Sequence, residues 1–209
     1  MSSTWVFGYG SLVWRPAFAH QESRPAFVRG LTRRFFQGST DHRGLPGAPG
    51  RVATLIPERE AVTWGTAYRV APQDRDAVLA KLDHRERGGY AQHRTTVFAS
   101  VGQREGDVSG DSKRPRDTVT PSGRAPAHVA GFASEGEALA EALVYVATHD
   151  NDNWLGDAPL IEMAAQIRQA EGPSGHNIEY VLELARALRA MGADDAHVFA
   201  LATLLDPGW

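Results

Sequence analysis

Cysteine is absent from this sequence of 209 residues. Its absence excludes disulfide bonds, a thiolate nucleophile and sulfur ligands for a metal. The eight histidines do not compensate, because none lies in the H-E-x-x-H spacing of a helical zinc site. We therefore expect a protein that uses neither a metal nor a cofactor.

Two further absences narrow the range of partners. No stretch approaches the roughly 18 consecutive apolar residues of a membrane span, and the segment Met1–Gly10 lacks the basic start and apolar core of a secretory signal. The net charge of −3 leaves no excess of basic residues for binding nucleic acid. We expect a cytoplasmic protein that binds neither membranes nor nucleic acid.

The residues that are present predict an α+β fold. A hydrophobic content of 42% and a charged content of 22% are typical of a soluble domain with its own core. Segments rich in aromatic and β-branched residues predict strands at 5–9, 27–36, 51–56, 62–70, 95–98 and 142–147. Helical spacing of apolar residues predicts helices at 72–85, 160–170, 178–191 and 193–205. Strands dominate the first part and helices the last, which favours α+β over a doubly wound sheet.

One segment, at about 101–133, differs from the rest of the chain. It is rich in Gly, Ser, Asp, Arg and Pro, has almost no large apolar residue, and exceeds the about 12–15 residues at which loops become unusual. We therefore expect a single domain over residues 1–209 that carries a disordered or mobile insertion at about 101–133.

The segment Val6–Leu12 is the first candidate site. Its glycines lie where a predicted strand ends, and glycine there permits a sharp turn and lets a ligand approach main-chain N–H groups. It is not a dinucleotide-binding loop, because Val13 occupies the position of the third glycine in G-x-G-x-x-G. The same pattern is also compatible with an ordinary strand end and a tight turn.

Glu86 is the second candidate. It lies at the end of the predicted helix 72–85, where the helix dipole disfavours a negative charge and burial would raise the pKa of the carboxyl. A raised pKa suits a base that must later return its proton. An exposed Glu in a charged run is the other interpretation of this position.

A third segment allows two interpretations. The segment Gly172–Asn177 fits a functional loop or a break between two helices in which Ser174 or Asn177 caps the second.

Taken together, these segments resemble the ChaC family of glutathione-specific γ-glutamylcyclotransferases. The resemblance extends from about residue 4 to about residue 200, apart from the segment 101–133. It rests on these ordered blocks: Val6–Leu12, Arg34–Gly44, Pro49–Val52, Trp64–Gly65, Leu82–Glu86 with Gly88–Tyr90, Tyr145 with Asp150–Asn151, and Gly172–Asn177. Phe36 departs from the pattern, because the family often has tryptophan there.

The resemblance implies the γ-glutamylcyclotransferase-like fold, a small mixed β-barrel with flanking helices. It also implies an enzyme that converts glutathione to 5-oxoproline and cysteinylglycine. By position, Glu86 is similar to the catalytic glutamate and Tyr145 to a tyrosine of the pocket. The segment similar to the substrate-binding loop comprises Val6, Phe7, Gly8, Tyr9, Gly10, Ser11 and Leu12.

The expected reaction needs no nucleophile from the protein. The α-amine of the γ-glutamyl group attacks its own γ-carbonyl, and we expect Glu86 to take up the amine proton and deliver it to the leaving amine. Main-chain N–H groups of Gly10, Ser11 and Leu12 are candidates for holding the substrate and its developing charge. Arg43 or Arg51 could bind the terminal carboxylate of glutathione.

Two alternatives stay open at this point. One is a cyclotransferase that acts on other γ-glutamyl amino acids or amines, which would use the same glutamate and glycine segment. The other is a non-catalytic protein that binds a γ-glutamyl metabolite. Glu86 argues against the second, since a pure binding protein needs no carboxylate beside the amine and the carbonyl.

Overall fold

The computed structural model describes residues 3–86, 89–100 and 136–209 of the chain. The predicted insertion at about 101–133 lies outside these residues, so the arrangement of one domain with an insertion stays a prediction. The elements are β1 (Thr4–Gly8), the short 3₁₀ helix η1 (Ser11–Val13), β2 (Glu22–Ser39), β3 (Gly50–Val70), α1 (Arg75–Arg85), β4 (Tyr90–Ser100), β5 (Gly136–Ala147), α2 (Leu160–Gln169), β6 (Glu171–Gly172), β7 (Gly175–His176), α3 (Asn177–Ala190) and α4 (Ala196–Leu205).

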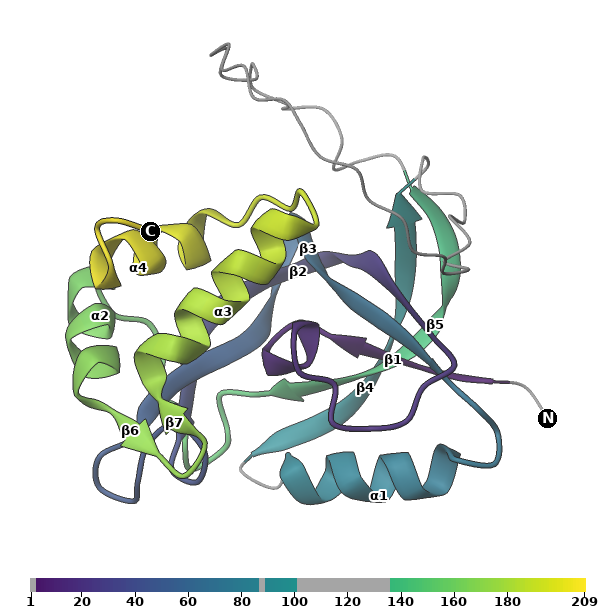
Figure 1. Ribbon diagram of the computed structural model, residues 1–209, viewed down its shortest axis with the longest axis horizontal. Coiled ribbons are helices and arrows are strands. Elements are labelled where there is room, and N and C mark those ends of the chain that lie inside the picture. Colours follow the sequence, from purple (N-terminus) through teal and green to yellow (C-terminus); the bar gives the residue numbers. More distant parts are fainter. Residues whose placement is uncertain (1–2, 87–88, 101–135) are drawn as a thin grey trace, which may run out of the picture.

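Five strands form a barrel with the neighbour order β1-β3-β2-β4-β5. Four of the pairings are antiparallel, and the parallel pairing of β5 with β1 joins the ends of the sheet. Helix α1 lies along one side of the barrel, while α2, α3 and α4 gather beside the far half of the β2–β3 hairpin (Figure 1). The mixed α+β architecture predicted from the sequence is confirmed.

The long β2–β3 hairpin forms part of the barrel at one end and contacts the helices at the other. Its register shifts between Arg29 and Leu31, where Gly30 has a φ of +75° that favours glycine. The residues of the hairpin before this bulge in β2, and their partners on β3, lie next to β1 in the barrel. The residues on the other side of the bulge lie beside α2, α3 and α4. The two strands predicted at 51–56 and 62–70 are one strand, β3, which pairs with β2 on both sides of the stretch 58–61, where the register shifts.

Alternation along the strands builds a continuous apolar core. Phe7, Leu55 and Val144 are fully or almost fully buried, and the core continues into the helices through Leu184 and Leu201. A smaller cluster, Val6, Val70, Val78, Leu82 and Tyr145, packs beneath α1 on the other face of β1. No helix in the described part of the chain has both the length and the apolar character required to cross a bilayer.

Asn177 joins α3 to the start of β3. It is completely buried, its Oδ1 accepts from the Arg51 N–H at 2.6 Å, and its Nδ2 donates to the Arg51 carbonyl at 2.9 Å. The predicted cap by Ser174 or Asn177 is wrong: His176 is the N-cap residue and no side chain caps the helix. The Asn177 amide instead satisfies the Arg51 backbone on the edge of β3 where the described residues place no paired strand.

We predict that Asn177→Ala lowers the free energy of unfolding by about 1–3 kcal/mol, because it leaves two buried main-chain groups of Arg51 without partners. Urea unfolding of both proteins measures the change. Glu183→Ala, on the exposed side of α3, is the control and should alter stability by no more than about 0.5 kcal/mol. Equal stabilities of the wild type and Asn177→Ala would contradict this role.

Candidate active site

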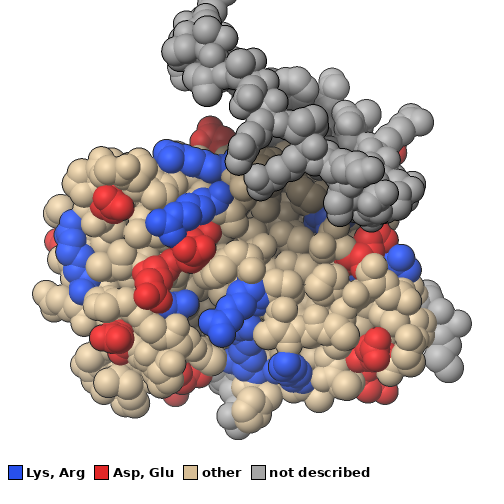
Figure 2. All heavy atoms as spheres, viewed as in Figure 1, with Lys and Arg blue, Asp and Glu red and all other residues tan. Residues whose placement is uncertain are grey.

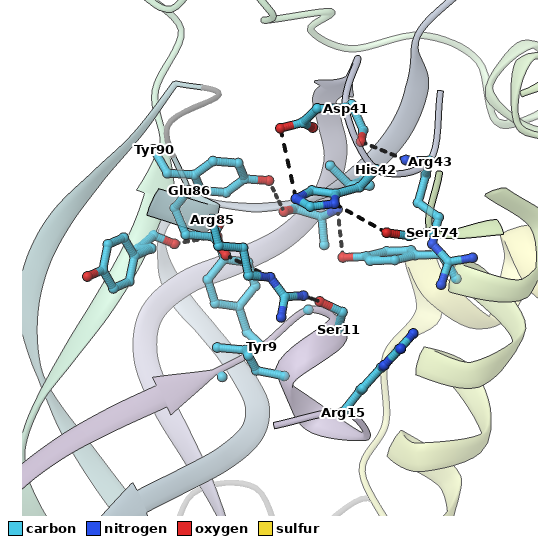
Figure 3. A pocket seen from close by; sticks show the side chains of 18 of the residues that line it. Tyr9, Ser11, Arg15, Asp41, His42, Arg43, Arg85, Glu86, Tyr90 and Ser174 are labelled. Atoms are coloured by element: carbon cyan, nitrogen blue, oxygen red, sulfur yellow. Dashed lines mark hydrogen bonds and ion pairs between the residues drawn. The ribbon is translucent and has the colours of Figure 1, made fainter. Parts of the chain in front are cut away.

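A cavity of about 500 Å³ opens where the barrel meets the helical half of the molecule. Its walls come from the end of β1 with η1, the segment after β2, the end of α1, the start of β4, and α3 (Figure 3). Elements far apart in the sequence thus meet around one space. Both sequence candidates, the glycine segment and Glu86, line it.

The chain turns sharply between β1 and η1, and two glycines make this turn possible. A Cβ on Gly8 would lie 2.5 Å from the Cβ of Leu12, and a Cβ on Gly10 would lie 2.7 Å from the Tyr180 hydroxyl. Ser11 and Leu12 then open the 3₁₀ turn, whose first N–H groups have no partner within the helix. The backbone of this turn is therefore presented to the cavity.

A buried guanidinium holds the turn in place. Arg33 is 1% exposed, and its Nε donates to the Tyr9 carbonyl at 2.9 Å. Its other nitrogens bond to the Trp64 carbonyl and to the carboxylate of Asp195, the residue that caps α4. One side chain thus fixes the end of β1 relative to β3 and α4. On the other side, the Tyr68 hydroxyl donates to the Leu12 carbonyl at 2.5 Å.

Glu86 is the C-cap residue of α1, and its side chain is only 18% exposed. Burial raises the pKa of the Glu86 carboxyl from 4.5 to about 7; Arg85 opposes this rise and Asp41 adds to it. Arg85 lies 3.4 Å from the carboxylate (Nε to Oε1) and also donates to the Ser11 hydroxyl. Glu86 can therefore accept and release a proton near neutral pH.

Tyrosines form much of the wall around this carboxyl. The Tyr9 hydroxyl donates to the Tyr145 carbonyl at 2.6 Å, and the Tyr90 hydroxyl donates to the Ala53 carbonyl at 3.2 Å. Burial raises the pKa of Tyr9 and Tyr90 well above the ordinary value, and that of Tyr180 to about 12. These phenols stay neutral at physiological pH, so they shield Glu86 from water without competing for its proton.

Tyr145 is oriented by a small polar network. Its hydroxyl donates to the Asp83 carboxylate at 2.6 Å and accepts from Gln92 at 3.0 Å, and Gln92 also donates to Asp83 at 2.6 Å. Asp83 and Glu86 lie at the end of the same helix, so the network couples the position of Tyr145 to the segment that carries the catalytic candidate.

The sequence model of the ChaC-like protein family matches residues 4–206. This chain belongs to the ChaC-like family. It is 41% identical over 201 residues to the human protein named glutathione-specific γ-glutamylcyclotransferase 1, covering 94% of this chain and 76% of that protein. It is 40% identical over 203 residues to γ-glutamylcyclotransferase 2-3 of Arabidopsis thaliana, covering 95% and 86%.

Among solved structures, the chain is similar to the yeast γ-glutamylcyclotransferase specific to glutathione. The two chains superpose with a TM-score of 0.79 at 29% identity, covering 99% of this chain and 97% of that one. The expectation of a γ-glutamylcyclotransferase-like fold for this ChaC-like protein is confirmed.

Most of the residues that the sequence singled out lie together. The predicted site residues that line the cavity are Phe7, Gly8, Tyr9, Gly10, Ser11, Leu12, Arg43, Glu86 and Tyr145. Two others do not line it, namely Val6 and Arg51.

Val6 belongs to the apolar cluster beneath α1, because alternation along β1 turns it away from Phe7. Arg51 is 6% exposed and donates to Gln166 (2.7 Å), to the Phe35 carbonyl (2.9 Å) and to the Gly156 carbonyl (3.0 Å). Neither Val6 nor Arg51 lines the cavity in this structure, so the geometry lends no support to their assignment to substrate binding, which stays a prediction.

The sequence interpretation missed several lining residues, namely Arg15, Asp41, His42, Arg85, Tyr90, Ser174 and Tyr180. Arg85 could have been noticed as the neighbour of Glu86. Nothing in the local pattern distinguishes Arg15 or Tyr180 from the many arginines and buried aromatic residues elsewhere. Within the described residues, no cluster of three or more His, Asp or Glu side chains could hold a metal ion.

The burial of Glu86 predicts a stability that depends on pH. Its pKa in the folded protein, about 7, lies above the ordinary value of 4.5, so between these values the folded state binds more protons than the unfolded state. Stability therefore falls as the pH rises through this window and levels off above it. The rise from 4.5 to about 7 corresponds to about 3 kcal/mol at most.

We therefore predict that Glu86→Gln, which cannot ionise, gains up to about 3 kcal/mol over the wild type between pH 4.5 and pH 8. Urea unfolding of both proteins across this range measures the difference. Glu183→Gln, at an exposed position, is the matched control and should follow the wild type. Parallel pH profiles for Glu86→Gln and the wild type would contradict the burial of this carboxyl.

Proposed function

We propose that this protein is an enzyme, a γ-glutamylcyclotransferase that cleaves glutathione to 5-oxoproline and cysteinylglycine. The observation that carries the proposal is the buried Glu86 carboxyl, with its pKa at about 7, in the same cavity as the turn Gly10–Leu12. The names of the human and yeast relatives support glutathione as the substrate. A cytoplasmic location stays a prediction.

The cavity suits a small peptide. Its volume of about 500 Å³ lies within the about 300–1,000 Å³ of small-molecule sites. Its lining combines tyrosine rings with a few charged groups, which can orient a flexible substrate into the geometry required for ring closure. In a reaction within one molecule, fixing that geometry is a main contribution of the protein.

The proposed reaction begins with a proton transfer. The α-ammonium group of the substrate cannot attack while it is protonated, and ionised Glu86 removes a proton from it. The free amine then attacks the γ-carbonyl carbon, a C–N bond forms, and the carbonyl oxygen becomes an oxyanion. Collapse of this intermediate breaks the bond to the cysteinyl nitrogen and leaves the five-membered lactam.

The protons balance through the same carboxyl group. The lactam nitrogen ends with one hydrogen, whereas the departing nitrogen gains two and leaves as an ammonium group. Two protons must therefore pass from the attacking nitrogen to the leaving nitrogen. Glu86 transfers them one at a time, acting as a base and then as an acid for each, which a pKa at about 7 permits. No covalent intermediate with the protein is required.

The developing oxyanion needs hydrogen-bond donors. We assign this role to main-chain N–H groups of the Gly10–Leu12 turn, because glycine at positions 8 and 10 lets the backbone face the cavity closely. Tyr145 is a second candidate for contact with the substrate. Its hydroxyl already donates to Asp83, so it can offer its ring or accept a hydrogen bond there without changing that donation.

Replacing Glu86 tests the central step. We predict that Glu86→Gln lowers kcat for release of 5-oxoproline from glutathione by about 10²–10⁴-fold, because the base is lost. Calorimetric binding of glutathione should stay within a few fold, since the amide preserves the shape of the side chain. Glu183→Gln is the control and should keep wild-type turnover. Retention of most activity by Glu86→Gln would remove Glu86 from this role.

The charges beside Glu86 predict opposite shifts in a pH profile. We expect kcat/KM for glutathione to rise with pH through about 7, as Glu86 ionises. Arg85 lowers and Asp41 raises the pKa of Glu86, so Arg85→Met should move the profile to higher pH and Asp41→Asn to lower pH. Shifts in the same direction, or none for either variant, would contradict this electrostatic account.

A further inference from the structure

Three guanidinium groups line the cavity among the described residues, those of Arg15, Arg43 and Arg85. Two of them have partners within the protein. Arg43 donates to the His176 carbonyl at 2.9 Å and to Glu179 at 3.2 Å. Arg85 contacts Glu86 and donates to the Ser11 hydroxyl. Arg43 is thus bonded to residues at the start of α3, and Arg85 is bonded to the proposed base and to the glycine turn.

The Arg15 side chain differs from both. It is exposed, and it has no hydrogen-bond or ion-pair partner in the part of the chain that the structure describes. In Figure 3 it extends from the turn after η1 toward the side of the cavity on which Arg43 and Ser174 are labelled. Figure 2 shows basic side chains near the middle of the same face, over the region of η1.

The backbone at Arg15 is nevertheless firmly held. Its N–H donates to the Ser11 carbonyl at 2.9 Å, which closes the turn of η1. The preceding ring, that of Trp14, packs edge-on against Tyr180 with ring centroids 5.4 Å apart. A positive group thus projects from the same turn that presents its backbone to the reacting centre, so the two are kept in a fixed relation.

Of the three guanidinium groups that line the cavity among the described residues, only that of Arg15 is left for a further anion, because Arg43 and Arg85 already contact groups of the protein. The Asp41 and Glu86 carboxylates also line the cavity, and Asp41 acts on Glu86 by raising its pKa. The γ-glutamyl end must lie beside Glu86 for the proposed reaction to proceed. The glycine carboxylate at the other end of glutathione must then lie away from Glu86, and Arg15 lines the cavity as an exposed cation.

We propose that Arg15 binds the glycine carboxylate of glutathione. It thereby favours this tripeptide over γ-glutamyl substrates that have no carboxylate at the end remote from the γ-glutamyl group. A guanidinium can hold a carboxylate through two parallel hydrogen bonds, which gives direction as well as attraction. This inference rests on the proposed function. It assigns to Arg15 the role that the sequence interpretation gave to Arg43 or Arg51.

The test pairs a change in the protein with a change in the substrate. Wild type and Arg15→Met are assayed for 5-oxoproline release from glutathione and from its glycine monoethyl ester, which lacks the charge. We expect Arg15→Met to reduce kcat/KM for glutathione by about tenfold, mainly through KM. The ester should lower the wild-type value by a similar factor and should not lower the Arg15→Met value further.

Additional variants separate the possible outcomes. Arg15→Lys should restore part of the loss, and Arg186→Met, an exposed arginine on α3, should behave as wild type with both substrates. The inference is overturned if Arg15→Met still distinguishes glutathione from the ester as the wild type does, or if Arg43→Met alone removes that distinction. If the wild type releases no 5-oxoproline from either substrate, the proposed function itself fails.

Discussion

The functional end of this molecule depends on one buried positive charge, the guanidinium of Arg33. A charge removed from water must find its partners within the protein, and Arg33 finds them on three separate elements, at Tyr9, Trp64 and Asp195. Satisfying that one group brings the end of β1 against β3 and the start of α4. The glycine turn after β1 is thereby held over the opening of the barrel.

Glu86 is also buried, but unlike Arg33 it has few partners within the protein. Its contact with Arg85, at 3.4 Å, is loose, and the surrounding wall consists largely of tyrosine rings. Burial therefore dominates, and the pKa of the carboxyl rises to about 7. A fully partnered charge such as Arg33 organises structure, whereas a poorly partnered one such as Glu86 retains the capacity to exchange a proton. An exposed charge such as Arg15 is available to a ligand.

Much of the fold and part of the site could be predicted from local patterns. The strand ending at Gly8, the helix ending at Glu86 and the alternation that places Tyr145 in β5 all follow from residues close in sequence. The joining of 51–56 and 62–70 into one strand could not be predicted, because the continuity of β3 depends on its pairing with β2, which is remote from 62–70 in sequence, on both sides of the stretch 58–61. Asn177 was misread for the same reason, since its partner Arg51 is remote in sequence.

The sequence by itself determined the α+β class, the two segments that carry the proposed chemistry and the absence of any thiol chemistry. Only the tertiary structure decided which arginine side chains are already bonded within the protein. Arg51 and Arg43 make bonds to groups distant in the chain, while Arg15 makes none among the described residues. A side chain's partners depend on which remote elements pack beside it, and periodicity within one element reports only the face on which the residue lies.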